Sequence, residues 1–360
     1  MISRINRLAA AALLLFAQYL SAADVPNHLV VLQYHHVSSD TPASTSISPE
    51  QFMQHMQWLA DNDFTVAPLP EAARSIRAGR RLPDRTVAIT FDDGYVNNYY
   101  AAFPVLRERG WPFTVFVNSD PVDAGRKGWV SWDQIREMAD SGANILNHTK
   151  THAFLIRKQA GESESAWLQR VQQEIEVAEA RILEETGQNE KILAYPYGES
   201  NRAVRALVDR LGYIAFGQHS GPVGAGSNFT DLPRFPLSGP YSTMDSYKTK
   251  MRSLPMPIVT VKSLSRSGDG DLFFEETQPV LEIGIAHEGR LPPLNCFASG
   301  QGAIPVSESG PGTYSVEAPK PLPVGRSRYN CTQASGIAGR YYWYSFPWVR
   351  RGPENQWTHQ

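Results

Sequence analysis

Short apolar runs alternate with amphipathic segments along most of this 360-residue chain. Apolar runs rich in β-branched residues, which are typical of buried strands, occupy residues 28–37, 64–66, 87–91, 113–117, 144–147, 192–195 and 213–216. The segments between them have the three- and four-residue spacing of amphipathic helices, at residues 49–59, 69–78, 99–109, 132–141, 165–186 and 202–211. This alternation predicts an α/β fold with a mainly parallel sheet or barrel.

The pattern changes after about residue 251. Glycine and proline become frequent and helical periodicity disappears. Short strands are predicted at residues 258–261, 280–285, 314–316 and 340–343. We therefore predict an α/β domain over residues 24–250 and a small β-sandwich over residues 251–360.

Residues 1–23 have the pattern of a secretory signal peptide. Arg4 and Arg7 precede the apolar run 8–16, and small residues follow at 21–23. The apolar run is too short to span a membrane, so no membrane span is predicted. We expect a mature protein that starts near Asp24 and lies in the periplasm or outside the cell.

The two cysteines, Cys296 and Cys331, both lie in the C-terminal region. In an oxidising compartment two lone cysteines usually pair, so we predict a disulfide that closes a loop of 35 residues. The chain-entropy model gives such a crosslink about 4 kcal/mol of stabilisation. Two free thiols or half of a metal site are alternatives, but neither a CxxC motif nor a nearby histidine pair accompanies the cysteines.

Two adjacent carboxylates, Asp92 and Asp93, follow the apolar run 87–91 and precede Gly94. In α/β proteins ligands bind at the carboxyl ends of strands, and adjacent residues on a strand point to opposite faces. One carboxylate can therefore hold a metal ion while the other acts as a base. Because Asp-Gly is also common in solvent-exposed turns, this interpretation depends on two further segments.

The second segment carries His148 and His152, which follow the short strand predicted at 144–147. Histidines four residues apart can share a metal ion, here from a loop, although such a pair can also be two surface histidines. With Asp93 they form an Asp-His-His set with open coordination positions. Such a set suits a catalytic divalent ion, for which zinc is the default.

The third segment is 194–199, in which Pro196 ends a strand and precedes Tyr197. The backbone N–H of Tyr197 could face the active site and stabilise an oxyanion, although the segment could also be an ordinary exit from a strand. His35 and His36 likewise end the first predicted strand, and at least one of them is expected to line the cleft.

In this order the motifs resemble the polysaccharide deacetylase family, the NodB-homology domain of carbohydrate esterase family four. Residues 90–94 match the family's first motif, residues 148–152 its H-S/T-x-x-H motif, and Pro196-Tyr197 the core of its third. Residues 34–37 and 132–135 are similar to periplasmic members that deacetylate poly-N-acetylglucosamine. The resemblance covers residues 24–250 and implies a distorted (β/α) barrel.

The resemblance also implies roles for individual residues. Asp93, His148 and His152 would bind one divalent ion, with zinc as the expected metal and cobalt or nickel as substitutes. Asp92 would be the general base that activates water, and the Tyr197 N–H would stabilise the oxyanion.

Two positions depart from the family pattern. The third motif usually has an arginine that orients the base, and here that position is Leu193, so another group must orient Asp92 or the activity is modest. The nearest match to the family's final L-x-x-H motif is Phe216-Gly217-Gln218-His219. His219 is therefore the candidate general acid, although an ordinary surface histidine fits the pattern nearly as well.

The predicted function is metal-dependent removal of N-acetyl groups from an N-acetylglucosamine-containing polysaccharide. His35, Tyr95 and Trp129 are the candidate substrate-binding residues, since aromatic rings can pack on sugar faces. The net charge of −2 favours a neutral glycan and suggests no nucleic-acid partner. A glycan O-acetyl esterase and a non-catalytic glycan-binding protein are the alternatives, and the oligomeric state is not predicted.

Overall fold

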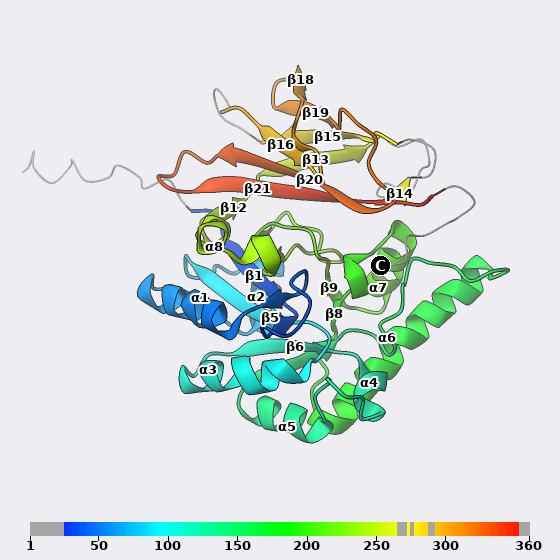
Figure 1. The fold of residues 1–360 in the computed structure, drawn as a ribbon. Coiled ribbons are helices and arrows are strands. Elements are labelled where there is room, and N and C mark those ends of the chain that lie inside the picture. Colours follow the sequence, from blue (N-terminus) through cyan, green and yellow to red (C-terminus); the bar gives the residue numbers. More distant parts are fainter. Residues whose placement is uncertain (1–24, 265–271, 274–276, 287–291, 353–360) are drawn as a thin grey trace, which may run out of the picture.

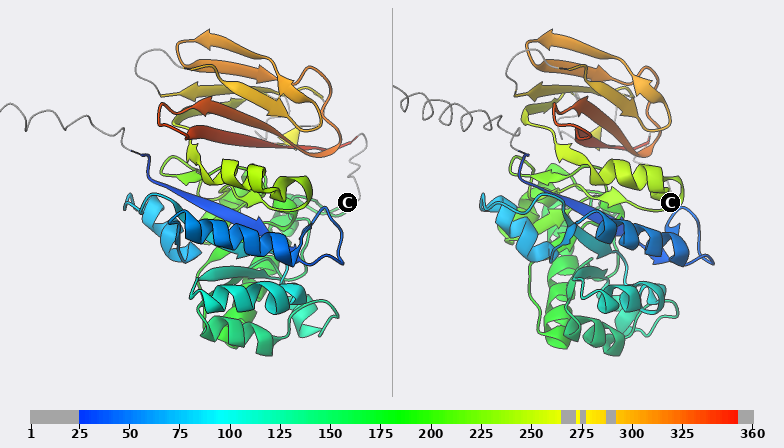
Figure 2. Two further views of the ribbon diagram at one scale, coloured as in Figure 1. Left: turned by 60° about the vertical axis from the view of Figure 1, so that its left-hand side comes forward. Right: turned by 90° about the vertical axis from the view of Figure 1, so that its left-hand side faces the viewer.

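The structure is a computed structural model that describes residues 25–264, 272–273, 277–286 and 292–352. Figure 1 shows an α/β part, formed by the chain up to residue 251, stacked against a β-rich part formed by the chain after it. Both further views show the same stacking (Figure 2). The predicted signal peptide, residues 1–23, lies outside the described residues.

One curled, mainly parallel sheet forms the centre of the α/β part. Its strands are β1 (His28–Tyr34), β4 (Thr65–Val66), β5 (Thr86–Phe91), β6 (Phe113–Val117), β7 (Ala143–Asn147), β8 (Ile192–Ala194), β9 (Ile214–Phe216), β10 (Val223–Gly224) and β11 (Phe235–Pro236). The main path runs β10-β1-β5-β6-β7-β8-β9, with β4 paired to β5 and β11 to β1. The predicted α/β class is confirmed, and the distorted barrel is present as a half-closed sheet.

Helices cover both faces of this sheet, which explains why its strands are apolar throughout. They are α1 (Pro49–Asp61), α2 (Leu69–Arg77), α3 (Phe103–Glu108), α4 (Ser119–Asp123), α5 (Trp132–Asp140), α6 (Glu164–Thr186), α7 (Arg202–Arg210) and α8 (Met244–Met251). All seven residues of β1 are buried: Val30 and Leu32 face one apolar cluster, while Leu29 and Val31 face another. This alternation follows from the two-residue repeat of a strand.

The helix predicted at 99–109 begins with a π-helical turn, Asn98–Ala102, before continuing as α3. Pro104 lies in the first turn of α3. Because proline has no N–H to donate to the carbonyl four residues earlier, it interrupts the regular pattern there. The sequence therefore predicted the helical segment but not its local geometry.

Helix α6 shows how sequence specifies the longest element. The Ser163 side chain caps its first turn by accepting a hydrogen bond from the Ala166 N–H, and Gly187 ends it in the left-handed conformation with φ 71°. Val171, Ile175 and Ile182 share the buried face.

The C-terminal strands form two sheets around a core of their own, which we call the C-terminal sandwich. One sheet contains β12 (Ser253–Pro255), β14 (Leu272–Phe273), β16 (Asn295–Ala298), β17 (Gly302–Ile304), β20 (Gly325–Ala334) and β21 (Tyr341–Arg350). The other contains β13 (Ile258–Ser263), β15 (Val280–Ile285), β18 (Val306–Gly310) and β19 (Thr313–Glu317). Their shared core includes Ile283 and Val316 from one sheet and Tyr329 and Trp348 from the other. The boundary between residues 250 and 251 stays a prediction.

The predicted disulfide between Cys296 and Cys331 is present in this core. The two residues are direct partners on the neighbouring antiparallel strands β16 and β20. The bridge therefore joins two strands that the chain reaches through a loop of 35 residues.

We predict that the double replacement Cys296→Ser and Cys331→Ser lowers the free energy of unfolding by about 2–5 kcal/mol, because the unfolded chain gains entropy when the loop opens. Urea unfolding of the variant and the unreduced wild type measures the difference. Two titratable thiols in the unreduced, denatured wild type would contradict the bridge.

Candidate active site

Neighbouring strands of the sheet deliver the candidate residues to one edge. Asp92 and Asp93 directly follow β5, and His148 directly follows β7. Strand β6 lies between these two and is parallel to both. The carboxyl ends of parallel strands meet at the same edge of a sheet, so residues far apart in the sequence lie together here.

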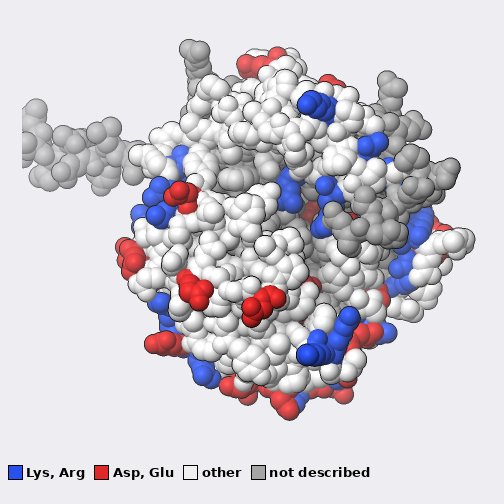
Figure 3. All heavy atoms as spheres, viewed as in Figure 1, with Lys and Arg blue, Asp and Glu red and all other residues white. Residues whose placement is uncertain are grey.

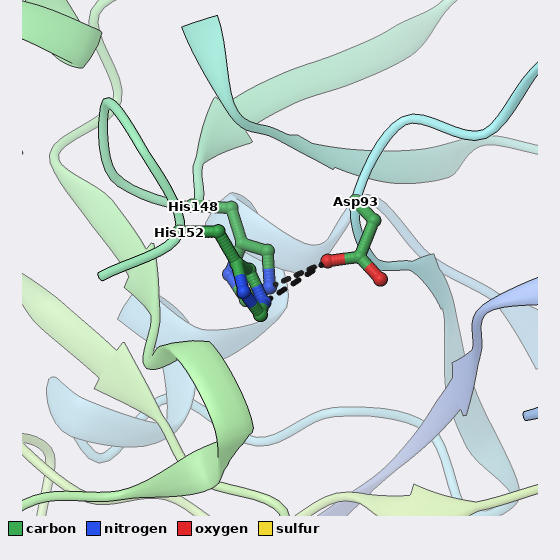
Figure 4. Close-up of side chains that lie close together, drawn as sticks. All are labelled: Asp93, His148 and His152. Atoms are coloured by element: carbon green, nitrogen blue, oxygen red, sulfur yellow. Dashed lines mark ion pairs between the residues drawn. The ribbon is translucent and has the colours of Figure 1, made fainter. Parts of the chain in front are cut away.

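Asp93, His148 and His152 form a three-residue cluster (Figure 4). The Asp93 Oδ1 atom lies 3.2 Å from the Nε2 atom of each histidine. One possible ligand atom from each residue lies within 4.8 Å of the others. The Asp-His-His set proposed from the sequence is therefore assembled in space.

The backbone at this cluster is strained. Asp93, Thr149 and His152 have left-handed φ angles of 73°, 69° and 60°, although none is glycine. Such conformations cost of order 1–3 kcal/mol each and gather at functional sites. Two hydrogen bonds hold Thr149 in place: its N–H donates to Asn147 Oδ1, and its hydroxyl oxygen accepts from the His152 N–H. This bend aims both histidines at Asp93 from a loop, as predicted.

The chemistry of the cluster fits a cation. His148 Nδ1 lies 2.7 Å from the Ala194 carbonyl oxygen, and since a carbonyl can only accept, Nδ1 carries the hydrogen. In the neutral ring the Nε2 lone pair then faces the Asp93 carboxylate. Both atoms are buried, and neither has a hydrogen-bond partner among the described residues. Two acceptors this close repel unless a proton or a metal ion lies between them, and zinc ligands about 2.0–2.2 Å from a shared ion have similar spacing.

The Asp92 side chain lies in a buried polar network next to the cluster. Its carboxylate is fully buried and accepts from Arg234 Nη1 at 2.6 Å, Arg234 Nη2 at 2.9 Å and Gln33 Nε2 at 2.7 Å. Burial by itself would raise the pKa of Asp92, but the positive charge of Arg234 and its hydrogen bonds bring that pKa below its ordinary value. The carboxylate is thus held ionised and in one orientation.

Arg234 is the functional residue that the sequence analysis missed. It lies directly before β11, which pairs with β1 so that Gln33 is opposite Pro236. Its guanidinium is fully buried and donates from Nε to the Gly217 carbonyl as well as to Asp92. An arginine within the apolar stretch Leu232 to Leu237 was the available signal. Arg234 thus contacts the Asp92 carboxylate, for which the sequence analysis expected an orienting group from elsewhere than position 193.

Comparison with known proteins agrees with this geometry. Residues 79–216 match the model of the polysaccharide deacetylase family. Over 190 residues the chain is 32% identical to YxkH of Bacillus subtilis, a provisionally assigned polysaccharide deacetylase, covering 52% of this chain and 63% of that protein. Residues 79–216 are thus similar to the polysaccharide deacetylase family, and for this similarity alone we call the α/β part the deacetylase domain.

Other relatives and solved structures support the fold of this deacetylase domain. The chain is 22% identical over 243 residues to poly-β-1,6-N-acetyl-D-glucosamine N-deacetylase of Escherichia coli K12, covering 58% of this chain and 36% of that protein. IcaB from Ammonifex degensii superposes with a TM-score of 0.52 at 27% identity, over 62% of this chain and 95% of that one. The Streptococcus pyogenes deacetylase PplD superposes with a TM-score of 0.57 at 21% identity, over 63% of this chain and 99% of that one. The chain thus spans less than two thirds of the length of the Bacillus subtilis and Escherichia coli relatives.

Tyr197 of the deacetylase domain lies in a tight turn. Pro196 and Tyr197 are its central residues, the Gly198 N–H donates to the Tyr195 carbonyl at 2.8 Å, and Tyr197 has φ 61° and ψ 2°. These values are those of a type II turn, which normally has glycine at the position of Tyr197. The Tyr197 ring lies edge-on to His152, with centroids 4.5 Å apart. Tyr197 therefore lies beside the Asp93, His148 and His152 cluster, and its role with an oxyanion stays a prediction.

The predicted substrate-binding residues lie around the same cluster. The His35 Nε2 atom is 3.9 Å from Asp92 Oδ2. Tyr95 stacks on His36 with centroids 3.7 Å apart and lies 5.3 Å from the Trp129 ring. The structure therefore brings His35, Tyr95 and Trp129 to the site, while their contacts with a sugar stay predictions.

His219 lies in a different setting. It lines a cavity of about 940 Å³ between the deacetylase domain and the C-terminal sandwich, together with Asp231, Trp343 and Tyr344. Its Nδ1 atom is 3.8 Å from Asp231 Oδ1. Burial, followed by the charges of nearby arginines, lowers the pKa of His219 to about 3, which favours the neutral ring. Its role as general acid stays a prediction.

We predict that Arg234→Gln lowers the free energy of unfolding by about 3–5 kcal/mol, since it leaves the Asp92 carboxylate buried without its cation. In the double variant with Asp92→Asn neither charge is left alone, so the loss is smaller than the sum of the two single losses. Urea unfolding measures all three.

Arg107→Gln is the matched control for this prediction. Arg107 pairs with Glu137 on the surface, and we expect its replacement to change stability by no more than about 1 kcal/mol. Strict additivity of the Asp92 and Arg234 replacements would contradict the proposed coupling.

Proposed function

We propose that this protein is a metal-dependent deacetylase that removes N-acetyl groups from an N-acetylglucosamine-containing polysaccharide. The observation that carries the proposal is the Asp93, His148 and His152 cluster next to a second carboxylate, Asp92, which Arg234 holds ionised. This arrangement separates a ligand carboxylate from a base carboxylate, as hydrolysis of an amide by activated water requires.

Asp93, His148 and His152 would hold one divalent ion, with zinc as the expected metal and cobalt or nickel as substitutes. When bound, such an ion supplies Lewis-acid polarisation of the acetyl carbonyl and lowers the pKa of water. The hydrogen bond from His148 Nδ1 to the Ala194 carbonyl fixes the ring so that Nε2 faces the site.

Asp92 takes the role of the general base. An ionised carboxylate has about four lone-pair sites, of which Arg234 and Gln33 occupy three. The remaining site is available to accept a proton from water. The fixed orientation set by Arg234 removes the need for the base to reorganise during the reaction.

The remaining roles follow the positions of the other predicted residues. The Tyr197 N–H is proposed to donate to the oxyanion that forms when water attacks the acetyl carbonyl. His219 is proposed as the acid that protonates the leaving amine, a role that requires its ring to be protonated when substrate is bound, because burial favours the neutral ring in the free protein. His35, Tyr95 and Trp129 are proposed to contact the sugar ring, with the aromatic faces packing on its apolar side.

The choice of polymer has independent support. The Escherichia coli relative is named for poly-β-1,6-N-acetyl-D-glucosamine, and the near-neutral net charge suits an uncharged glycan. We propose a periplasmic or secreted location from the pattern of residues 1–23. Within the described part of the chain, none of the helices combines the length and hydropathy needed to cross a membrane.

We predict that the wild type binds one zinc-class ion and that Asp93→Asn and His148→Ala each lose it, because each removes a direct ligand. Asp92→Asn retains the ion, since Asp92 bonds to Arg234 instead. Metal analysis after dialysis against a chelator and reloading with zinc measures this, and a thermal shift on reloading reports binding independently. Equal metal content in wild type and Asp93→Asn would contradict the assignment.

The proposed activity predicts acetate release from β-1,6-linked N-acetylglucosamine oligomers, with turnover rising with chain length because remote binding energy is used at the transition state. Asp92→Asn should lower turnover about 10²- to 10⁴-fold while keeping the metal. Release from an O-acetylated glycan alone would favour the esterase. Binding of oligomers without release from any substrate would favour a non-catalytic protein.

A further inference from the structure

Strand β20 presents two arginines to the deacetylase domain. Its residues alternate, so that Ser327, Tyr329 and Cys331 are buried in the sandwich while Arg326 and Arg328 point the other way. Arg326 Nη1 donates to the Tyr197 carbonyl oxygen at 2.6 Å, and Arg328 Nη1 donates to the Gln218 carbonyl oxygen at 3.1 Å. Figure 3 shows lysine and arginine atoms in the seam between the two parts.

Both carbonyls belong to loops at the carboxyl edge of the sheet. Tyr197 follows β8, and Gln218 follows β9. The two loops are in close contact, since a Cβ atom added to Gly198 would lie 2.6 Å from the Gln218 Cβ. The two arginines therefore bind two loops that are already in contact with one another.

Arg326 contacts the most strained part of this edge. The left-handed conformation of Tyr197 persists only if surrounding groups hold it. Its ring stacks on Phe154, with centroids 3.8 Å apart and an interplanar angle of 5°. Its carbonyl is held by Arg326. One of these supports thus comes from the deacetylase domain and the other from the C-terminal sandwich.

Arg326 is itself anchored by charge. Its Nε atom lies 3.9 Å from the Glu199 carboxylate, which is buried and also lies 3.7 Å from Arg157. The guanidinium carbon lies 5.8 Å from the centre of the Tyr197 ring. Arg326 is therefore oriented by Glu199 toward the turn.

We propose that Arg326 is a positioning residue for the Tyr197 turn, and that the C-terminal sandwich is thereby a working part of the active site. The proposal rests on the proposed function, in which the Tyr197 N–H meets the oxyanion. Holding the Tyr197 carbonyl fixes the peptide unit that follows that N–H, in a turn where the Tyr197 ring lies against His152. A misplaced oxyanion donor affects the transition state more than the bound substrate.

Arg340 provides a matched control at the same interface. It also reaches from the sandwich to the α/β part, donating to the Asp84 carboxylate at 3.1 Å, and it donates to the carbonyl of Arg252, the residue just after α8, at 2.9 Å. Asp84 precedes β5, whereas Asp92 follows it, so Arg340 acts at the opposite edge of the sheet from the site. Its loss weakens docking without touching Tyr197.

The experiment compares Arg326→Gln, Arg326→Lys and Arg340→Gln in the zinc-loaded full chain, using a β-1,6-linked N-acetylglucosamine oligomer. Arg326→Gln should lower kcat about 10- to 100-fold with KM changed by no more than about threefold, because the oxyanion donor is displaced. Arg326→Lys should recover part of kcat, because an ammonium group can still donate to the carbonyl. Arg340→Gln should keep kcat within about twofold of wild type.

Hydrogen exchange of residues 195–199 is a second readout that needs no substrate. Exchange in this turn should become faster in Arg326→Gln and stay as in wild type in Arg340→Gln. Faster exchange in the first variant alone supports the positioning role even if the wild type releases no acetate, in which case only the proposed function fails.

Three results would overturn the proposal. One is wild-type kcat in Arg326→Gln, and another is unchanged exchange in its turn. The third is an equal fall of kcat in Arg326→Gln and Arg340→Gln that follows their thermal stability, which would mean that the sandwich acts only by stabilising the fold.

Discussion

The buried ion pair between Asp92 and Arg234 is the interaction on which the site depends. Both side chains are fully removed from water, and the desolvation of such a pair often outweighs its Coulomb attraction. Well-packed apolar residues of similar volume would therefore serve stability at least as well. The pair makes sense for function, because it keeps a carboxylate ionised and oriented beside the Asp93, His148 and His152 cluster. It also joins β5 to the segment before β11, so the sheet edge and the base are held by the same contact.

The strained backbone residues at the site are held by contacts from several parts of the chain. Asp93, His152 and Tyr197 all adopt left-handed backbone conformations, and each is held by neighbours that come from different parts of the chain. The strands beneath are buried on both faces and supply a rigid base. The C-terminal sandwich adds contacts from above through β20. The edge of the sheet that carries the site thus lies between the apolar core of the α/β part and that of the sandwich.

The sequence by itself determined most elements of the α/β part and the Asp93, His148 and His152 cluster, but not several strands of the sandwich, β20 among them. The apolar runs of the strands and the repeat near 3.6 in α6 depend only on residues close in the chain, so composition, periodicity and capping residues identify them. Asp93, His148 and His152 could also be placed from sequence, because each follows a strand and parallel strands end at one edge. The disulfide followed from there being two cysteines. The π-helical turn before α3 was missed because it depends on how one proline alters a hydrogen-bond pattern.

The tertiary structure alone decided which residues support the site. Arg234 and Asp92 are 142 positions apart, and Arg326 and Tyr197 are 129 apart. The departure at Leu193 showed that an orienting group was needed, but nothing local indicated that it would come from the segment before β11. His219 was likewise placed by the packing of the sandwich, which encloses it in the cavity between the two parts. Such contacts are determined by which segments cross the sheet edge and how two cores dock, and neither is encoded in the spacing of neighbouring residues.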